Sequence, residues 1–303
     1  MVDEKVKKQL HQSHLALLYR CGEKFRRSVI ENEKEPSTTP LVIGSATHFT
    51  NARNLQNKID KGSLLPREAI QDYCRDDFNQ QWEGSSIMLT DDELSKGLIR
   101  TRDTAQDVTI RLILAYHYDI ANQINPKRVE RKWVLKAPDH DFDISGTMDV
   151  DEGDIIRDTK TMKINGGQRI VDLSEQYTFY SMGKYYIDKI LPKYVYQDNS
   201  IKPTEKREAY GVSYRSTRTL EDFKIALSRF SMACSVIKKG SFVPANPVDP
   251  LCSPKFCGFY NTCKYVNGVK VARLMTTGKE VKKAKEGAGS IIDSLTKTLK
   301  PEA

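Results

Sequence analysis

Two acidic residues and a lysine stand close together in the segment GTMDVDEGDIIRDTKT, residues 146–161. Asp149 falls near the end of one expected strand, and Asp158 and Lys160 fall on the next. Because side chains alternate along a strand, Asp158 and Lys160 share a face and Thr159 points away. Two carboxylates can bind a hard cation such as Mg²⁺, and a neighbouring lysine can orient or help deprotonate water and offset charge on a phosphate. The expected chemistry is metal-dependent phosphodiester hydrolysis.

The spacing of the two acids constrains the hairpin that carries them. A regular hairpin centred on Glu152 pairs Gly146 with Asp158, which leaves Asp149 roughly 10 Å from Asp158. That separation is too large for one ion. We therefore expect a bend or bulge near Asp149, with Gly146 and Gly153 as plausible sites for it.

Two pairs of residues accompany this segment at helical spacing. Gly44 and His48 are four residues apart in an expected helix, and Gln176 and Tyr180 show the same spacing directly after the second strand. Residues four apart share one face of a helix. A lone histidine is more often a hydrogen-bonded structural residue than a ligand. Neither pair is evidence by itself, and the inference depends on the order of both pairs and the acidic segment along the chain.

Taken in this order, the residues resemble the PD-(D/E)XK nuclease superfamily, in particular its RecB-like exonuclease branch, which includes the CRISPR-associated RecB-like exonucleases. The residues that match the central motif are Gly146, Asp149, Asp158, Thr159 and Lys160. Met148 stands where the superfamily's name has proline. The resemblance covers nearly the whole chain, from His14 to Cys263. It implies an α/β fold with a restriction-endonuclease-like core, in which a mixed central sheet is flanked by helices.

The resemblance also implies a role for each site residue. The implied ligands of Mg²⁺ or Mn²⁺ are His48, Asp149, Asp158 and the backbone carbonyl of Thr159. The implied catalytic residues are Asp149, Asp158, Lys160, Gln176 and Tyr180. Gln176 and Tyr180 look like the family's Q-x-x-x-Y motif, which lies beside the catalytic centre and contacts the DNA backbone. Glu130 resembles a strand acid upstream of Asp149, with no role assigned.

Four cysteines are placed as metal or cluster ligands rather than as a disulfide framework: Cys21, Cys252, Cys257 and Cys263. Four thiolates bind either a tetrahedral zinc or an iron–sulfur cluster. The RecB-like nucleases often carry one cysteine before the core and three after it, which implies a structural 4Fe-4S cluster here, with structural Zn²⁺ as the alternative. The gap of four residues between Cys252 and Cys257 departs from the two residues common in that family. Cys74 and Cys234 fall in helical patterns and are expected to be buried.

Hydrophobic periodicity places these motifs on alternating elements. Helices are expected over residues 6–30, 40–59, 66–82, 91–122, 174–190 and 220–239, and strands over 128–137, 141–150, 154–161 and 208–216. We expect one nuclease domain over residues 1–278, followed by a polar C-terminal tail over 279–303. Within that domain the expected parts are a helical region (about 1–125), a sheet-containing core (about 126–240) and a C-terminal cysteine cluster (about 250–266) joined to Cys21.

The composition is consistent with a nucleic-acid partner without identifying one. The net charge is +8, from 48 Lys and Arg against 40 Asp and Glu, and this suits a phosphate-rich partner but is common in other proteins. No apolar run approaches the length that spans a bilayer, so a cytoplasmic protein with no membrane partner is expected, in the host cytoplasm if the gene belongs to a phage. No Walker-type phosphate loop is present, so the expected activity is ATP-independent.

These observations predict a metal-dependent DNA exonuclease that acts on DNA ends or single strands. An endonuclease with the same fold is a second reading. A rival from another class is a noncatalytic subunit that binds DNA ends or a protein partner in recombination, replication or CRISPR adaptation. The intact carboxylates and lysine argue against that rival, because a binding module gains nothing from two clustered acids facing phosphate.

Overall fold

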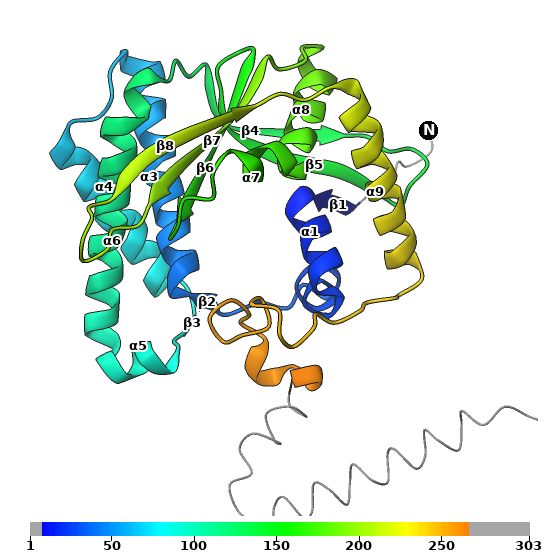
Figure 1. Cartoon of the computed structure of the whole chain (residues 1–303), viewed down its shortest axis with the longest axis horizontal. Helices are drawn as coiled ribbons and strands as arrows, with labels where there is room; N and C mark the ends of the chain where they lie inside the picture. The colour runs from blue at the N-terminus through cyan, green and yellow to red at the C-terminus, as the bar shows by residue number, and fades with distance from the viewer. Residues whose placement is uncertain (1–7, 267–303) are drawn as a thin grey trace, which may run out of the picture. The chain divides into compact units, whose positions relative to one another are not determined.

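The strands form one mixed sheet in the order β1-β5-β6-β7-β8, and β4 pairs with the remaining edge of β5 (Figure 1). Their bounds in this computed structural model, which describes residues 8–266, are β1 (Lys8–His11), β4 (Arg128–Leu135), β5 (Phe142–Asp151), β6 (Ile155–Met162), β7 (Tyr194–Ile201) and β8 (Tyr210–Ser216). β1 runs parallel to β5 and β6 parallel to β7, whereas the other neighbours are antiparallel. The expected mixed central sheet is therefore confirmed.

Helices cover both faces of this sheet. On one face lie α3 (Thr39–Lys61), α4 (Arg67–Glu83) and α6 (Leu98–Asp119), and on the other lie α1 (Gln12–Arg20), α8 (Glu175–Asp188) and α9 (Leu220–Lys238). Shorter elements connect them: α2 (Gly22–Phe25), α5 (Asp91–Lys96), α7 (Gln168–Leu173) and a two-stranded sheet of β2 (Ser37–Thr38) and β3 (Ile87–Met88). Within the described residues, no helix is both long and apolar enough to cross a bilayer.

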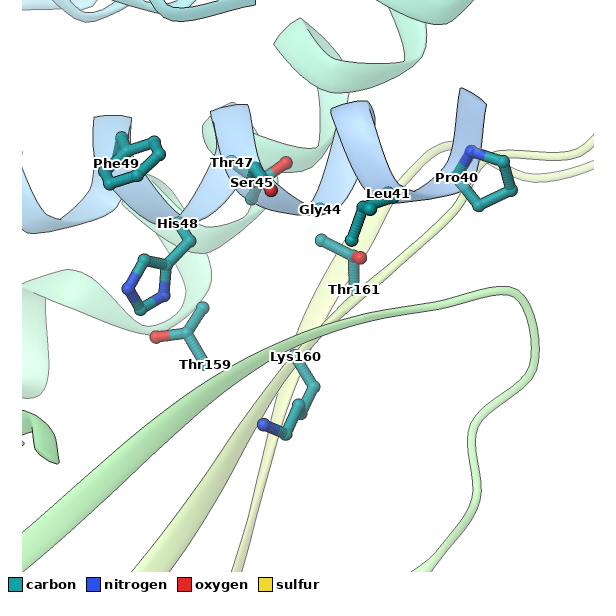
Figure 2. A pocket seen from close by; sticks show the side chains of 10 residues that line it. All are labelled: Pro40, Leu41, Gly44, Ser45, Thr47, His48, Phe49, Thr159, Lys160 and Thr161. Carbon is teal, nitrogen blue, oxygen red and sulfur yellow. The ribbon is translucent and has the colours of Figure 1, made fainter. Parts of the chain in front are cut away.

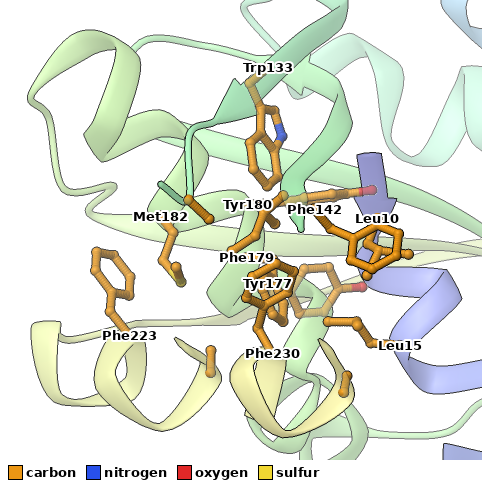
Figure 3. Close-up of a cluster of buried hydrophobic side chains, with 14 of the residues drawn as sticks. Leu10, Leu15, Trp133, Phe142, Tyr177, Phe179, Tyr180, Met182, Phe223 and Phe230 are labelled. Atoms are coloured by element: carbon orange, nitrogen blue, oxygen red, sulfur yellow. The ribbon is translucent and has the colours of Figure 1, made fainter. Parts of the chain in front are cut away.

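The largest hydrophobic core lies between the sheet and the layer of α1, α8 and α9 (Figure 3). Large aromatic and aliphatic side chains fill it, among them Leu15, Phe179 and Phe230, which are fully buried. Trp133 of β4 lies between Gly146 and Gly183, and a Cβ atom at either glycine would overlap the indole ring. Glycine at these two positions therefore lets α8 pack closely against β4 and β5.

The main elements lie where the sequence predicts them, with three corrections. The first expected helix does not begin near residue 6, because residues 8–11 form β1, and it is interrupted at Cys21. The long helix expected over 91–122 is two helices separated by Gly97, which has a φ of 84°. Strand β7 is absent from the prediction, because its sequence YVYQDNSI mixes buried polar and apolar residues instead of alternating them.

The chain divides into two compact units, Met1–Ala245 and Asn246–Ala303. All the helices and strands above lie in the first. The described part of the second, residues 246–266, consists of turns and a 3₁₀ turn over Tyr260–Thr262. The predicted tail over 279–303 lies outside the described residues, and the single-domain organisation stays a prediction.

One edge of β5 is shared between two strands. β1 pairs with Phe142–Ser145 and β6 pairs only with Val150 and Asp151, while β4 occupies the opposite edge along most of β5. Among the described strands, residues 146–149 therefore have no partner on the shared edge. We call this interval the β5 opening, and β5 and β6 diverge there after two residue pairs.

A buried ion network supports the base of the β5 opening. The ammonium of Lys184 lies 2.7 Å from Asp151 and 2.7 Å from Asp188, and Arg131 bonds to both acids. Lys184 and Asp151 have no exposed side-chain surface. Burial alone would raise the pKa of Asp151, but the ammonium of Lys184 and the Gly153 amide outweigh it, and the pKa is lowered.

We predict that Lys184→Met lowers the free energy of unfolding by about 3 kcal/mol, because it leaves buried carboxylates short of a cation. Chemical denaturation at neutral pH measures this. The matched control is Lys224→Met, whose exposed pair with Glu221 contributes at most about 0.5 kcal/mol. Equal stability of the two variants would contradict a structural role for the network.

Candidate metal centre

Asp149 and Asp158 stand opposite each other at the β5 opening. The observed pairs Val150–Arg157 and Asp151–Ile156 make Asp149 and Asp158 the next facing positions. The prediction that Gly146 pairs with Asp158 is wrong, because the turn between the strands is centred between Gly153 and Asp154 and not on Glu152. The acids meet through this register rather than through the predicted bulge at Gly146 or Gly153.

His48, Glu130 and Asp149 form a group whose ligand atoms all lie within 4.8 Å of one another. His48 of α3 places Nε2 2.9 Å from Glu130 Oε1 and Nδ1 3.5 Å from Asp149 Oδ2. Burial would lower the pKa of His48, but hydrogen bonds to Asp149 and Glu130 outweigh it and raise the pKa to about 10. In the metal-free protein this imidazole is therefore positively charged at neutral pH.

Glu130 reaches this group through an irregular backbone conformation within β4. Its φ is 50°, in the left-handed region that non-glycine residues seldom adopt. Arg131 bonds to Asp188 of α8, whereas Val129 packs in the cluster of Leu55 on α3, and Glu130 also points to α3. Two successive side chains thus face the same layer, and the second meets His48. Such local backbone strain is concentrated at functional sites.

Asp158 faces the helical layer that contains α8, on the other side of the sheet from α3. Its carboxylate accepts hydrogen bonds from Gln176 at 2.8 Å, Tyr177 at 3.1 Å and Tyr180 at 3.3 Å, all from α8. Lys160 Nζ lies 2.8 Å from the same carboxylate. Only 1% of Asp158 is exposed, and burial raises its pKa to about 6 against the opposing effect of Lys160.

Lys160 is held as a cation. Burial would lower its pKa, but the carboxylates of Asp158 and Asp149 outweigh burial and raise it. Lys160 therefore carries a positive charge at neutral pH, and of the two roles expected from the sequence, orienting water and offsetting phosphate charge fits better than deprotonating water. Thr159, between the two site residues, donates its backbone N–H to Asp149 Oδ2 at 2.8 Å.

A cavity of about 270 Å³ lies at the β5 opening, and the buried Asp158 is not among the residues that line it. Its walls include the site residues His48, Glu130, Asp149, Lys160, Gln176 and Tyr180. The first residues of α1, Gln12 and Ser13, close another side together with His11, whose Nδ1 lies 3.1 Å from Ser145 Oγ. The chain thus brings together residues from β1 to α8 that are far apart in sequence.

The structure places nearly all the predicted site residues at this opening and adds two. Gln176 and Tyr180 bond to each other at 2.6 Å and to Asp158, so they fix this carboxylate as well as facing the cavity. Tyr177 was not predicted; a buried acid requires donors, and that requirement is the signal that could have identified it. Glu130 had no assigned role, and only the register of β4 shows that it lies opposite Asp149.

The cysteines fall into two kinds. Cys74 and Cys234 are buried as predicted, and burial raises their thiol pKa values to about 12 and about 11. Cys21 is partly exposed, and its Sγ accepts backbone N–H groups from Lys24 and Ala245, both at 3.4 Å. Three more cysteines, in the second unit, are partly exposed: Cys252, Cys257 and Cys263. None of the six forms a disulfide.

Comparison with known proteins leaves the assignment open. No protein-family model matches the chain, and no curated protein matches it. A solved structure titled "Crystal structure of SSO0001" aligns with 77% of this chain and 87% of its own, at 10% sequence identity and a TM-score of 0.32. A likeness this weak carries no argument, so the functional inference rests on the geometry of the site.

We predict that Mn²⁺ affinity rises with pH, by up to about tenfold per unit between roughly pH 6 and 8, because binding must displace a proton from His48. The raised pKa of Asp158 acts in the same direction near pH 6. Isothermal titration calorimetry in buffers of different ionisation enthalpy measures affinity and proton release together. His48→Ala should weaken binding and abolish proton release above about pH 7, where Asp158 is already ionised, whereas His140→Ala, beside Phe230 of α9, should change neither. A pH-independent affinity would contradict the role of His48.

Proposed function

We propose that this chain is a divalent-metal-dependent DNA nuclease whose mixed sheet is a restriction-endonuclease-like core. The observation that carries the proposal is the convergence of His48, Glu130 and Asp149 beside the Asp158–Lys160 pair at the β5 opening. An acidic group with one imidazole suits Mg²⁺ or Mn²⁺, and an adjacent cation suits a phosphate.

His48, Glu130 and Asp149 would hold the cation, with Asp158 next to them. Their oxygen and nitrogen donors fit a hard or borderline ion, and His48 carries a proton that such an ion would replace. When bound, the metal supplies activation of water and neutralisation of phosphate charge. The proposal keeps the predicted carbonyl ligand from Thr159. The backbone N–H of Thr159 is bonded to Asp149, so the backbone of this residue lies beside the metal group.

The chain's own groups account for the remaining chemistry. Lys160 presents a permanent positive charge to the phosphate and a donor to the attacking water. Gln176 and Tyr180 keep Asp158 in place and line the cavity wall. To contact the DNA backbone, each would exchange one of its hydrogen bonds within the site for one to the DNA. Tyr177 is a positioning residue, because its hydroxyl bridges Asp158 and Gln197 inside the core.

An exonuclease acting on DNA ends or single strands is the form of this activity that we favour. The site lies in a cavity of about 270 Å³, which is small beside a duplex but admits one phosphodiester of an unpaired strand. The rival is a noncatalytic subunit that binds DNA ends or a protein partner in recombination, replication or CRISPR adaptation. A raised pKa at Asp158 and strain at Glu130 favour catalysis over simple binding.

We further propose that Cys21, Cys252, Cys257 and Cys263 bind a structural 4Fe-4S cluster, with Zn²⁺ as the alternative. Two backbone amides point at Cys21 Sγ, an arrangement that stabilises a thiolate ligand. The other three cysteines lie in turns, where their backbone groups form hydrogen bonds: Cys252, Cys257 and Cys263. Such turns are typical of ligand loops.

We predict that Asp158→Asn and Lys160→Met each lower Mn²⁺-dependent cleavage of end-labelled single-stranded DNA by about a hundredfold or more. Controls are Asp154→Asn and Lys132→Met, which change exposed residues on neighbouring parts of the same sheet. Circular dichroism confirms that each variant folds. Comparison of linear with circular single strands separates exonuclease from endonuclease. A wild-type protein that binds DNA but never cuts it with either metal would overturn the proposal in favour of the binding subunit.

We predict that anaerobically purified protein contains iron and acid-labile sulfide, and that Cys21→Ser and Cys257→Ser lose both. Cys234→Ser is the control, because this thiol lies on α9 and is buried in the main hydrophobic core. Elemental analysis distinguishes the cluster from zinc. Stoichiometric zinc without sulfide would establish the alternative, and retention of either metal by all the variants would contradict a four-cysteine site.

A further inference from the structure

A second cavity, of about 390 Å³, lies between α3 and β6 (Figure 2). His48 and Lys160 line this cavity as well as the metal cavity, so the two meet at these side chains. A strand whose phosphate lies beside Lys160 therefore has a neighbouring nucleotide within reach of the second cavity. None of the residues that line it is acidic.

The wall of this cavity is an exposed stripe of α3. Leu41, Ser45 and Phe49 are four residues apart and so share one face of the helix. Leu41 is 56% exposed and Phe49 is 44% exposed, so both side chains are accessible to a ligand in this cavity. Thr161 of β6 forms part of the facing wall, near Gly44.

We propose that this cavity receives an unpaired nucleobase next to the scissile phosphate, with Phe49 as the stacking residue. The proposal rests on the nuclease function above and specifies its substrate as single-stranded or frayed DNA. Aromatic side chains stack with bases of any sequence, because every base has a π-face. The lining also carries the hydroxyls of Ser45, Thr47, Thr159 and Thr161. Stacking on Phe49 itself does not distinguish one base from another.

A paired base does not suit this position. Within a duplex the faces of each base are covered by its neighbours, so an aromatic ring can stack with it only after the base has left the helix. Phe49 lies one residue after His48, and their rings are 5.9 Å apart in an edge arrangement. The stacking residue and the histidine of the metal group are thus fixed on the same turn of α3.

The test measures binding of a fluorescently labelled oligothymidylate by anisotropy, in chelator so that no cleavage occurs. Phe49→Ala should weaken binding about tenfold, the effect expected for loss of one stacked base. Phe49→Trp should bind at least as well as wild type, whereas Phe49→Leu, apolar but without a π-face, should resemble Phe49→Ala. The control is Tyr118→Ala, an exposed aromatic on α6 that lines neither cavity. Affinity for blunt duplex DNA should be the same for all.

The outcomes separate this proposal from the nuclease proposal. Mn²⁺ titration of Phe49→Ala checks that His48 still binds metal, and cleavage of the same oligonucleotide is measured in parallel. Phe49-dependent binding without any cleavage by the wild type would support the base site and overturn the nuclease. Wild-type cleavage with unchanged affinity and KM in Phe49→Ala, or wild-type behaviour of Phe49→Leu, would overturn the base site alone. Absence of oligothymidylate binding would overturn the base site, and absence of cleavage as well would overturn both proposals and favour a protein partner on this stripe.

Discussion

The sharing of one edge of β5 between β1 and β6 is the constraint on which the site depends. Backbone groups within a sheet are normally paired along the whole strand, and an interruption leaves room for side chains and solvent between strands. Here the interruption spans residues 146–149, with Asp149 at its end and Asp158 facing it from β6. Side chains from both helical layers can reach this interval, because no strand of the described sheet fills it.

The surrounding structure keeps the interval open and charged. Lys184 and Arg131 form ion pairs with Asp151, which belongs to one of the two residue pairs that join β5 to β6. Trp133 packs between Gly146 and Gly183, which allows α8 to lie close to β4 and β5. From α8, tyrosine and glutamine donors fix Asp158. From α3, His48 neutralises part of the negative charge of Asp149 and Glu130. A divalent cation would replace the proton on His48 and neutralise the remaining negative charge of the two carboxylates.

The sequence predicted most of the residues that the structure brings to the β5 opening, but not their geometry. Periodicity located the main helices and strands β4, β5, β6 and β8, and motif spacing singled out Asp149, Asp158 and Lys160. The register between β5 and β6 depends on the exact position of a turn that no local pattern specifies, so the predicted pairing was wrong. Strand β7 and the position of Glu130 beside Asp149 were not predicted for a related reason: both are defined by neighbours across the sheet rather than along the chain.

The most direct test of this account is the position of Mn²⁺ in crystals of the protein, located by its anomalous scattering. The account predicts one strong peak in the β5 opening, with Asp149, Glu130 and His48 at coordination distance, about 2.0–2.3 Å. Loss of that peak in Glu130→Gln crystals would show that the strained glutamate is a ligand. A metal peak elsewhere in the chain, in crystals of protein that cleaves DNA, with the opening empty, would contradict the account.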